Sequence, residues 1–194
     1  TSLSRELVFL AGGDLAMILI FGALASLVLG IGMTVSACYI FLAIVLAPAI
    51  IEGGINPLAA HLYVLYWGVL SFITPPVAIA AITASSISNS SALKTGFLSM
   101  RLGSILFFLP ILFIFDPAML MQGDTIKIIL SFSMAVFAII IISSAFEGYL
   151  YFLGNINNIF RILFFITGIL ILMPNLISKY FGFSLLMVLL FILV

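Results

Sequence analysis

Long apolar stretches, separated by a few charged residues, make up most of this chain. No Asp, Glu, Lys or Arg occurs in residues 15–51 or in residues 53–93. Shorter uncharged stretches follow at residues 102–115, 128–146, 162–178 and 180–194. An α-helix needs about 20 residues to cross the hydrocarbon core of a bilayer. The pattern therefore predicts an all-α polytopic membrane protein.

The first uncharged stretch predicts a re-entrant hairpin. Residues 15–51 are too many for one span and slightly too few for two spans with a turn. Gly30 and Gly32 interrupt the stretch near its middle, and the polar residues Thr34 and Ser36 follow them. We therefore predict two helical legs at about residues 15–51, with the tip of the hairpin at these four residues.

The second stretch predicts a broken helix at about residues 57–88. It begins at Pro57, which is typical of a helix start, and Pro75 and Pro76 interrupt it. Proline lacks a backbone donor and clashes with the preceding helical turn, so two in succession should unwind the helix. The polar stretch Ser85–Ser91 then indicates a loop.

The remaining stretches predict further transmembrane helices. One span is expected at about residues 96–115, because the long side chain of Arg101 can reach back to the membrane interface. Residues 121–194 are expected to form additional C-terminal transmembrane helices. The chain starts at Thr1 and ends inside an apolar stretch, so we expect it to be part of a longer protein.

Composition supports this interpretation and excludes several classes of protein. Hydrophobic residues make up 65% of the chain and charged residues 6%, against roughly 25% charged in a soluble domain. Six basic and six acidic residues cancel, so no nucleic-acid partner is expected. The single cysteine, Cys38, excludes a disulfide framework or a cysteine-rich zinc cluster.

The few basic residues predict the orientation. With the expected spans, Lys94, Arg101 and Arg161 fall on one face of the membrane, and Lys127 and Lys179 fall on the other. The excess of basic residues favours the first face as cytoplasmic.

Chemistry is expected where the helices are interrupted, because unpaired backbone groups at membrane depth are retained where they line a cavity or bind something. Exposed helix amino ends attract carboxylates, and freed carbonyl groups coordinate cations. The candidate residues for substrate or ion binding are Gly30, Gly32, Thr34, Ser36, Ser71, Thr74, Pro75 and Pro76. We expect no cofactor. A sodium ion is placed near Gly32 and Thr74, since hard oxygen donors suit such ions.

Simpler interpretations compete with these. Glycine and proline are common in transmembrane helices, where most of them only kink or pack the helix. His61, the only histidine, is a candidate for a polar role such as proton relay. The simpler alternative is that its side chain only makes a hydrogen bond at the membrane interface. No constellation of nucleophile, base and acid and no ATP-binding loop occurs in the sequence, so we do not expect an enzyme.

Short motifs in a fixed order resemble the fused permeases of TRAP transporters, in the branch served by TAXI-type binding proteins. The most specific motif is LGIGMTVSACYI at residues 29–40, which resembles that family's hairpin. The others are APA at 47–49, PLAAHL at 57–62, ITPPVA at 73–78, KTGF at 94–97, RLG at 101–103 and FDPA at 115–118. The resemblance is dense from about residue 29 to residue 120 and thin afterwards.

The resemblance implies an ion-transporter-like elevator fold, of which this chain holds the second half, with one re-entrant hairpin and one broken helix. Residues 1–120 would be half of a transport domain. Gly30 and Gly32 match the family's hairpin tip, and Thr74, Pro75 and Pro76 match its broken helix. His61 and Tyr39 also match family positions, without an assigned role.

The implied function is that of a permease subunit in a secondary importer of small organic acids, driven by a sodium or proton gradient. Its implied partners are a TAXI-type periplasmic substrate-binding protein, a small carboxylate substrate and the lipid bilayer. The implied location is the bacterial inner membrane, with multiple spans. A channel or a non-transporting membrane scaffold is the alternative, and an intramembrane enzyme is a further one.

The sequence departs from the family pattern at the hairpin tip. Where the family commonly has Pro-Thr-Thr, this chain has Thr34, Val35 and Ser36. The proline is lost, a valine methyl replaces one hydroxyl, and a serine replaces the other. We therefore expect ion contacts or substrate choice at this tip to differ from those of close relatives.

Overall fold

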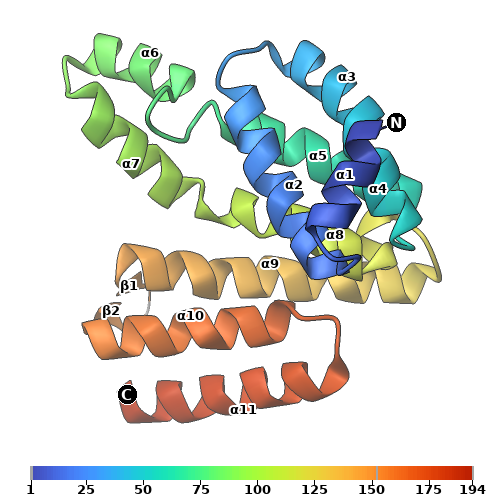
Figure 1. The fold of residues 1–194 in the computed structure, drawn as a ribbon. Coiled ribbons are helices and arrows are strands. Elements are labelled where there is room, and N and C mark those ends of the chain that lie inside the picture. The colour runs from blue at the N-terminus through green and yellow to red at the C-terminus, as the bar shows by residue number, and fades with distance from the viewer. Residues whose placement is uncertain (1, 152, 194) are drawn as a thin grey trace. The chain divides into compact units, whose positions relative to one another are not determined.

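The computed structural model describes residues 2–151 and 153–193 (Figure 1). Helices dominate these residues, which confirms the predicted all-α membrane class. The chain forms two compact units, of which the first ends at Ile114 and the second begins at Phe115. The sequence-based division after residue 120, and its assignment of a transport-domain half, stay predictions.

The first unit is built entirely from helices. Its elements are α1 (Ser2–Leu10), α2 (Leu15–Gly30), α3 (Val35–Val45), α4 (Ala47–Glu52), α5 (Pro57–Leu70), α6 (Ile79–Ser88), α7 (Ala92–Leu102), the short 3-10 helix η1 (Ser104–Phe107) and α8 (Leu109–Phe115). Helix α5 packs against α2, α3 and α4, and α6 packs against α7. Most of its buried residues are small or branched, and Ala47, Ile50, Ala59 and Val64 are 0% exposed.

The stretch predicted as a hairpin folds as helix α2, a turn at residues 31–34 and a second leg that is divided at Leu46 into α3 and α4. Asp14 begins α2, because its carboxylate accepts a hydrogen bond from Ala16 N at 2.7 Å. Thr34 begins α3 in the same way, since its hydroxyl oxygen accepts from Ala37 N at 3.4 Å. That the hairpin is re-entrant stays a prediction.

The stretch predicted as a broken helix is interrupted between α5 and α6, around Pro75 and Pro76. Helix α5 begins at Pro57, after Asn56 caps it by accepting a hydrogen bond from Leu58 N at 2.9 Å. Ala78, with a left-handed φ of 39°, precedes α6.

The serine-rich segment expected as a loop from Ser85 is helical as far as Ser88. The Ser85 hydroxyl donates to Ile82 O at 2.7 Å, and the Ser88 hydroxyl donates to Ala84 O at 3.0 Å. A serine hydroxyl can donate a hydrogen bond to a backbone carbonyl of the preceding helical turn. The polar side chains therefore did not end the helix at Ser85.

The segment expected as one span at about residues 96–115 contains a bend of 69° at Gly103. A side chain at Gly103 would come within 2.8 Å of Ile73 Cδ1, so this position packs directly against the break between α5 and α6. The two bent parts together are long and apolar enough for a broken span or a re-entrant loop. The bend falls at the pair Gly103-Ser104, a combination at which helices commonly kink, and the packing of Gly103 on Ile73 fixes it there.

The second unit is a row of three long helices, with α10 between α9 and α11 (Figure 1). Its elements are the 3-10 helix η2 (Pro117–Leu120), α9 (Thr125–Glu147), strands β1 (Tyr149–Leu150) and β2 (Gly154–Asn155), α10 (Asn158–Leu172) and α11 (Leu176–Leu193). The two strands form an antiparallel pair that connects α9 to α10. Side chains at Gly168 and Gly182 would collide with Ile142 and Ile171 on the neighbouring helices, so these glycines permit close helix packing.

Two helices in the described residues, α9 and α11, are each long and apolar enough to cross a membrane, and the bent pair of α7 and α8 would make three. Their outward surfaces are apolar: Ile126 is 73% exposed on α9 and Phe191 is 87% exposed on α11. Contiguous apolar surface of this kind is stable in contact with lipid and not in contact with water.

Candidate functional site

The tip of the hairpin and the break in the broken helix line one hollow of about 430 Å³ in the first unit. We call it the tip pocket. Five of its lining residues belong to the turn of the hairpin and its flanks, and two flank the break. They are Ile31, Gly32, Met33, Thr34, Val35, Phe72 and Ile79. The tertiary structure thus brings together the two interruptions that the sequence singles out separately.

Gly30 fixes the hairpin tip against the broken helix. A side-chain carbon at this position would lie 2.5 Å from Gly68 O and 2.6 Å from Ser71 Oγ. Real side-chain carbons do not approach other atoms so closely, so the end of α2 can contact the end of α5 only because residue 30 has no side chain. Gly68 of α5 also contacts Cys38 of α3. A side-chain carbon at Gly68 would lie 3.2 Å from Cys38 Sγ.

Hydroxyl groups satisfy the last carbonyls of α5 next to the break. Ser71 Oγ donates to Gly68 O at 2.7 Å, and Thr74 Oγ1 donates to Leu70 O at 2.7 Å. A helix end leaves its last carbonyls without intrahelical partners, so these two bonds stabilise the point at which α5 stops. The oxygen of each hydroxyl keeps lone pairs that can accept a hydrogen bond or coordinate a cation.

The backbone of the break is held in its irregular path by neighbouring elements. Ala80 N donates to Phe72 O at 3.0 Å across the break, and Ala78 N donates to Thr74 O at 3.2 Å. On α7, a side chain at Gly96 would lie 2.9 Å from Pro75 Cγ, so α7 packs closely on the proline. The break is therefore a supported structure.

Four helix ends meet at the tip pocket and determine its electrostatics. Helices α3 and α6 begin there, at Val35 and Ile79, and helices α2 and α5 end beside it, at Gly30 and Leu70. Beginning helices present partial positive charge and N–H donors, and ending helices present partial negative charge and carbonyl oxygens. None of the lining side chains is ionisable. The pocket can thus offer donors to an anion and carbonyl oxygens to a cation.

Only some of the predicted site residues line this pocket. Gly32 and Thr34 line it, and both are exposed. Ser71 is only 3% exposed and lies beneath Gly30, so it supports the tip from inside. The remaining predicted residues are not among those that line the pocket: Gly30, Ser36, Thr74, Pro75 and Pro76. Their roles in binding stay predictions.

The predicted sodium position, near Gly32 and Thr74, would depend on carbonyl and hydroxyl oxygens. Within the described residues there is no group of three or more His, Cys, Asp and Glu side chains that could hold a metal ion. Backbone carbonyls at the ends of α2 and α5 and the hydroxyl oxygens of Thr34 and Thr74 are oxygen donors in this region.

His61 pairs with Tyr39, which the sequence could not show. The Tyr39 hydroxyl and His61 Nδ1 are 3.2 Å apart, and the two rings meet edge to face with centroids 6.0 Å apart. The bond joins α3 to α5, and both side chains are half-buried. The pair therefore helps to hold the second leg of the hairpin against the broken helix. Whether His61 also relays protons stays a prediction.

Removing the Tyr39 hydroxyl should measurably weaken this contact. We expect Tyr39→Phe to lower the free energy of unfolding by about 0.5–1.5 kcal/mol, the usual contribution of one hydrogen bond. Thermal unfolding of the purified permease in detergent would measure it. Tyr66→Phe is a matched control, because Tyr66 packs edge to face on Phe113 and its hydroxyl has no hydrogen bond within the described residues. Equal shifts for both variants would contradict the prediction.

A further long-range bond was not predicted. The hydroxyl of Tyr63, which is 2% exposed, donates to Leu19 O at 2.7 Å and so ties α5 to α2. A tyrosine flanked by apolar residues was the available signal, but helical spacing gives no information about a partner that lies 44 residues away.

The comparison with protein families gives one match. The family model described as "Tripartite ATP-independent periplasmic transporter, DctM component" matches residues 1–119. The matched residues include the hairpin, the broken helix and every residue that lines the tip pocket. No curated protein and no solved structure matches this chain.

Proposed function

Because the chain belongs to the DctM family of permease components in tripartite ATP-independent periplasmic transporters, we propose that it supplies half of the substrate-translocating site of an ion-driven importer of small organic acids. The observation that supports this most directly is the tip pocket, in which two interrupted membrane segments meet. Transporters commonly build substrate and ion sites from discontinuous helices in this way.

The family implies a periplasmic substrate-binding protein as partner and a small molecule as substrate. We propose a TAXI-type binding protein, because the motif at residues 29–40 resembles the permeases of that branch. The bacterial inner membrane is the proposed location, since a periplasmic partner delivers its substrate to that membrane.

The proposed chemistry uses the two kinds of helix end at the pocket. Carbonyl oxygens around Gly32 and Thr74 would coordinate the coupling cation, with the hydroxyl oxygen of Thr74 as a further donor. The amino end of α6, after Pro76, would hold the substrate carboxylate together with the hydroxyls of Thr34 and Ser36. A bound cation beside a bound carboxylate lowers the cost of burying either charge, so each favours binding of the other.

The packing around Gly30 supports movement of the site as one body. The contact of Gly30 with Gly68 and Ser71 leaves no room for the tip to slide on the broken helix. Two further hydrogen bonds hold the hairpin on α5. Tyr63 bonds to Leu19 of α2, and His61 bonds to Tyr39 of α3. A rigid hairpin and broken helix that cross the membrane together, carrying ion and substrate, constitute the elevator mechanism that we propose.

Uptake into proteoliposomes tests the proposal. We would reconstitute the intact permease that contains this chain, add its substrate-binding protein, and impose a sodium or a proton gradient. Labelled mono- and dicarboxylates would serve as substrates. We expect accumulation that requires both the gradient and the binding protein, and the effective gradient identifies the coupling ion.

Two other results would contradict the proposal. Equilibration of substrate without a gradient and without the binding protein would indicate a channel. No uptake of any carboxylate, by a correctly inserted permease with a ligand-loaded partner, would favour a non-transporting scaffold.

A further inference from the structure

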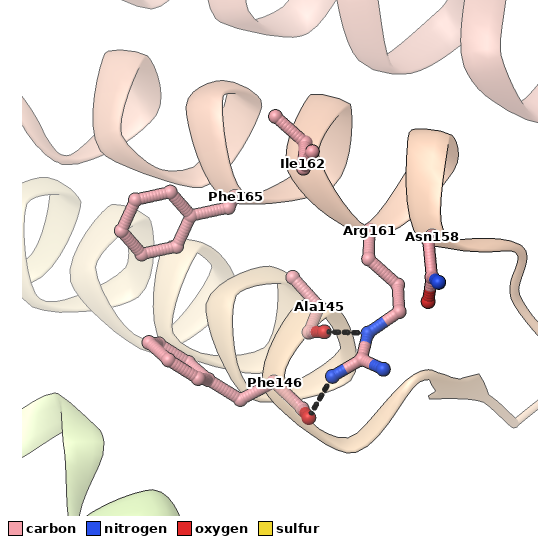
Figure 2. A pocket seen from close by; sticks show the side chains of 6 residues that line it. All are labelled: Ala145, Phe146, Asn158, Arg161, Ile162 and Phe165. Atoms are coloured by element: carbon pink, nitrogen blue, oxygen red, sulfur yellow. Dashed lines mark hydrogen bonds between the residues drawn. The ribbon is translucent and has the colours of Figure 1, made fainter.

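Outside the region of the proposed transport site, the second unit has a pocket built around one arginine (Figure 2). It measures about 360 Å³ and lies where α9 ends and α10 begins. We call it the arginine pocket. Its lining residues are Ala145, Phe146, Asn158, Arg161, Ile162 and Phe165.

The guanidinium group of Arg161 is fixed in position by the end of α9. Arg161 Nε donates to Ala145 O at 2.9 Å, and Arg161 Nη2 donates to Phe146 O at 2.7 Å (Figure 2). These carbonyls belong to the last turn of α9, where intrahelical partners are lacking. A guanidinium has five N–H groups, and within the described residues only two of those of Arg161 have a hydrogen-bond partner, so the other three can serve a ligand. The side chain is thus oriented before any ligand arrives.

Gly148 makes this arrangement possible. It ends α9 with a left-handed φ of 70°, which glycine adopts without strain. Arg161 lies closely over it: a side-chain carbon at Gly148 would be 3.3 Å from three atoms of the arginine.

Beside this cation the pocket is apolar. Phe146 and Phe165 meet edge to face with ring centroids 5.4 Å apart, and Ile162, one residue after the arginine, is 62% exposed. No carboxylate lines the pocket, and Asn158 supplies the other polar side chain. A fixed cation next to an apolar wall suits an amphiphile with an anionic head.

The position of the pocket along the helices indicates which amphiphile is available. Helix α9 is long and apolar enough to cross a membrane, so its end at Glu147 lies at the level of the lipid headgroups. The distribution of basic residues predicts that this end is cytoplasmic. Anionic phospholipids give the cytoplasmic leaflet its negative surface potential.

We propose that the arginine pocket binds an anionic phospholipid. The phosphate oxygens would accept hydrogen bonds from the free N–H groups of Arg161 and from the amide of Asn158, and an acyl chain would lie along Ile162 and Phe165. Arginine suits this task because its planar group can donate two parallel bonds to one phosphate. The bound lipid would stabilise the connection between α9 and α10, independently of transport.

Lipid retention measured by native mass spectrometry tests the proposal. The intact permease would be purified in detergent and supplied with phosphatidylglycerol or phosphatidylcholine. We expect Arg161→Gln to reduce the retention of phosphatidylglycerol roughly tenfold, as expected for the loss of a charge-assisted phosphate contact. Lys127→Gln is the matched control, because Lys127 is an exposed cation near the other end of α9. It should leave retention unchanged.

A second variant keeps the arginine and fills the apolar groove. Ile162→Trp should also reduce phosphatidylglycerol retention while Arg161 still caps α9, so it decides the question if Arg161→Gln fails to fold. Millimolar inorganic phosphate should not displace the lipid, because the acyl chain contributes to binding. Displacement by phosphate would show that the pocket takes a free anion instead. Equal effects of Arg161→Gln and Lys127→Gln, or normal retention in Ile162→Trp, would overturn the proposal.

Discussion

Gly30→Ala is expected to abolish substrate uptake and to destabilise the permease. The added carbon would lie 2.5 Å from Gly68 O and 2.6 Å from Ser71 Oγ, and the first of these is backbone that cannot rotate away. The hairpin tip must therefore move off the broken helix, which opens the tip pocket and separates its donors. Overpacking of this kind costs roughly 1–3 kcal/mol. Gradient-driven uptake and thermal unfolding of the same preparation would measure both effects.

Gly32→Ala is the matched control two residues further along the turn. The same added carbon at Gly32 would have no atom within 4 Å, so the turn can accept it. We expect normal thermal stability, because no neighbouring atom is displaced, and this readout separates the clash at Gly30 from the loss of a glycine as such. An equal loss of thermal stability in both variants would show that the contact of Gly30 with α5 is not the cause.

Replacing Pro75 and Pro76 together with alanine is expected to abolish uptake without preventing membrane insertion. Each proline disfavours a helix interior by about 3 kcal/mol relative to alanine. Its removal allows α5 to continue past Leu70, and a continuous helix has no free amino end at Ile79 to hold a carboxylate and no free carbonyls for a cation. Pro75 would also lose its packing on Gly96 of α7. Uptake assays, with helix content followed by far-ultraviolet circular dichroism, would measure both changes.

Pro57→Ala controls for the loss of a proline as such. Pro57 stands at the first turn of α5, where a missing N–H group costs little and a fixed φ is favourable. We expect this variant to insert and to transport normally. Full, gradient-driven uptake by the double variant of Pro75 and Pro76 would exclude a transport role for the break.

Several parts of the fold could be predicted because lipid imposes a constraint that acts along the sequence itself. Charges are costly in hydrocarbon, so the uncharged stretches coincide with helices such as α9 and α11. Backbone rules act locally as well: Gly30 ends α2, Gly32 lies in the turn that follows it, and Pro75 and Pro76 lie in a break.

Other parts could not be predicted, because their cause lies in distant residues. The bend at Gly103 had a local signal in the pair Gly103-Ser104, but the packing on Ile73 that accompanies it joins distant residues. The position of the Arg161 side chain depends on carbonyl groups of another helix. From the sequence alone, Arg161 therefore indicated only how the chain is oriented in the membrane. Ser71 was placed among the ligand-binding candidates by its proximity to the break, but the structure buries it under Gly30.

By itself the sequence determined that this protein is helical and membrane-embedded, and where its helices are interrupted, because helix propensity and the cost of charge in lipid are properties of short segments. Only the tertiary structure decided that the two interruptions share one pocket, that Tyr39 meets His61, and that Arg161 is held in place beside an apolar wall. Each of these depends on close packing between helices, and such contacts join residues that lie far apart along the chain.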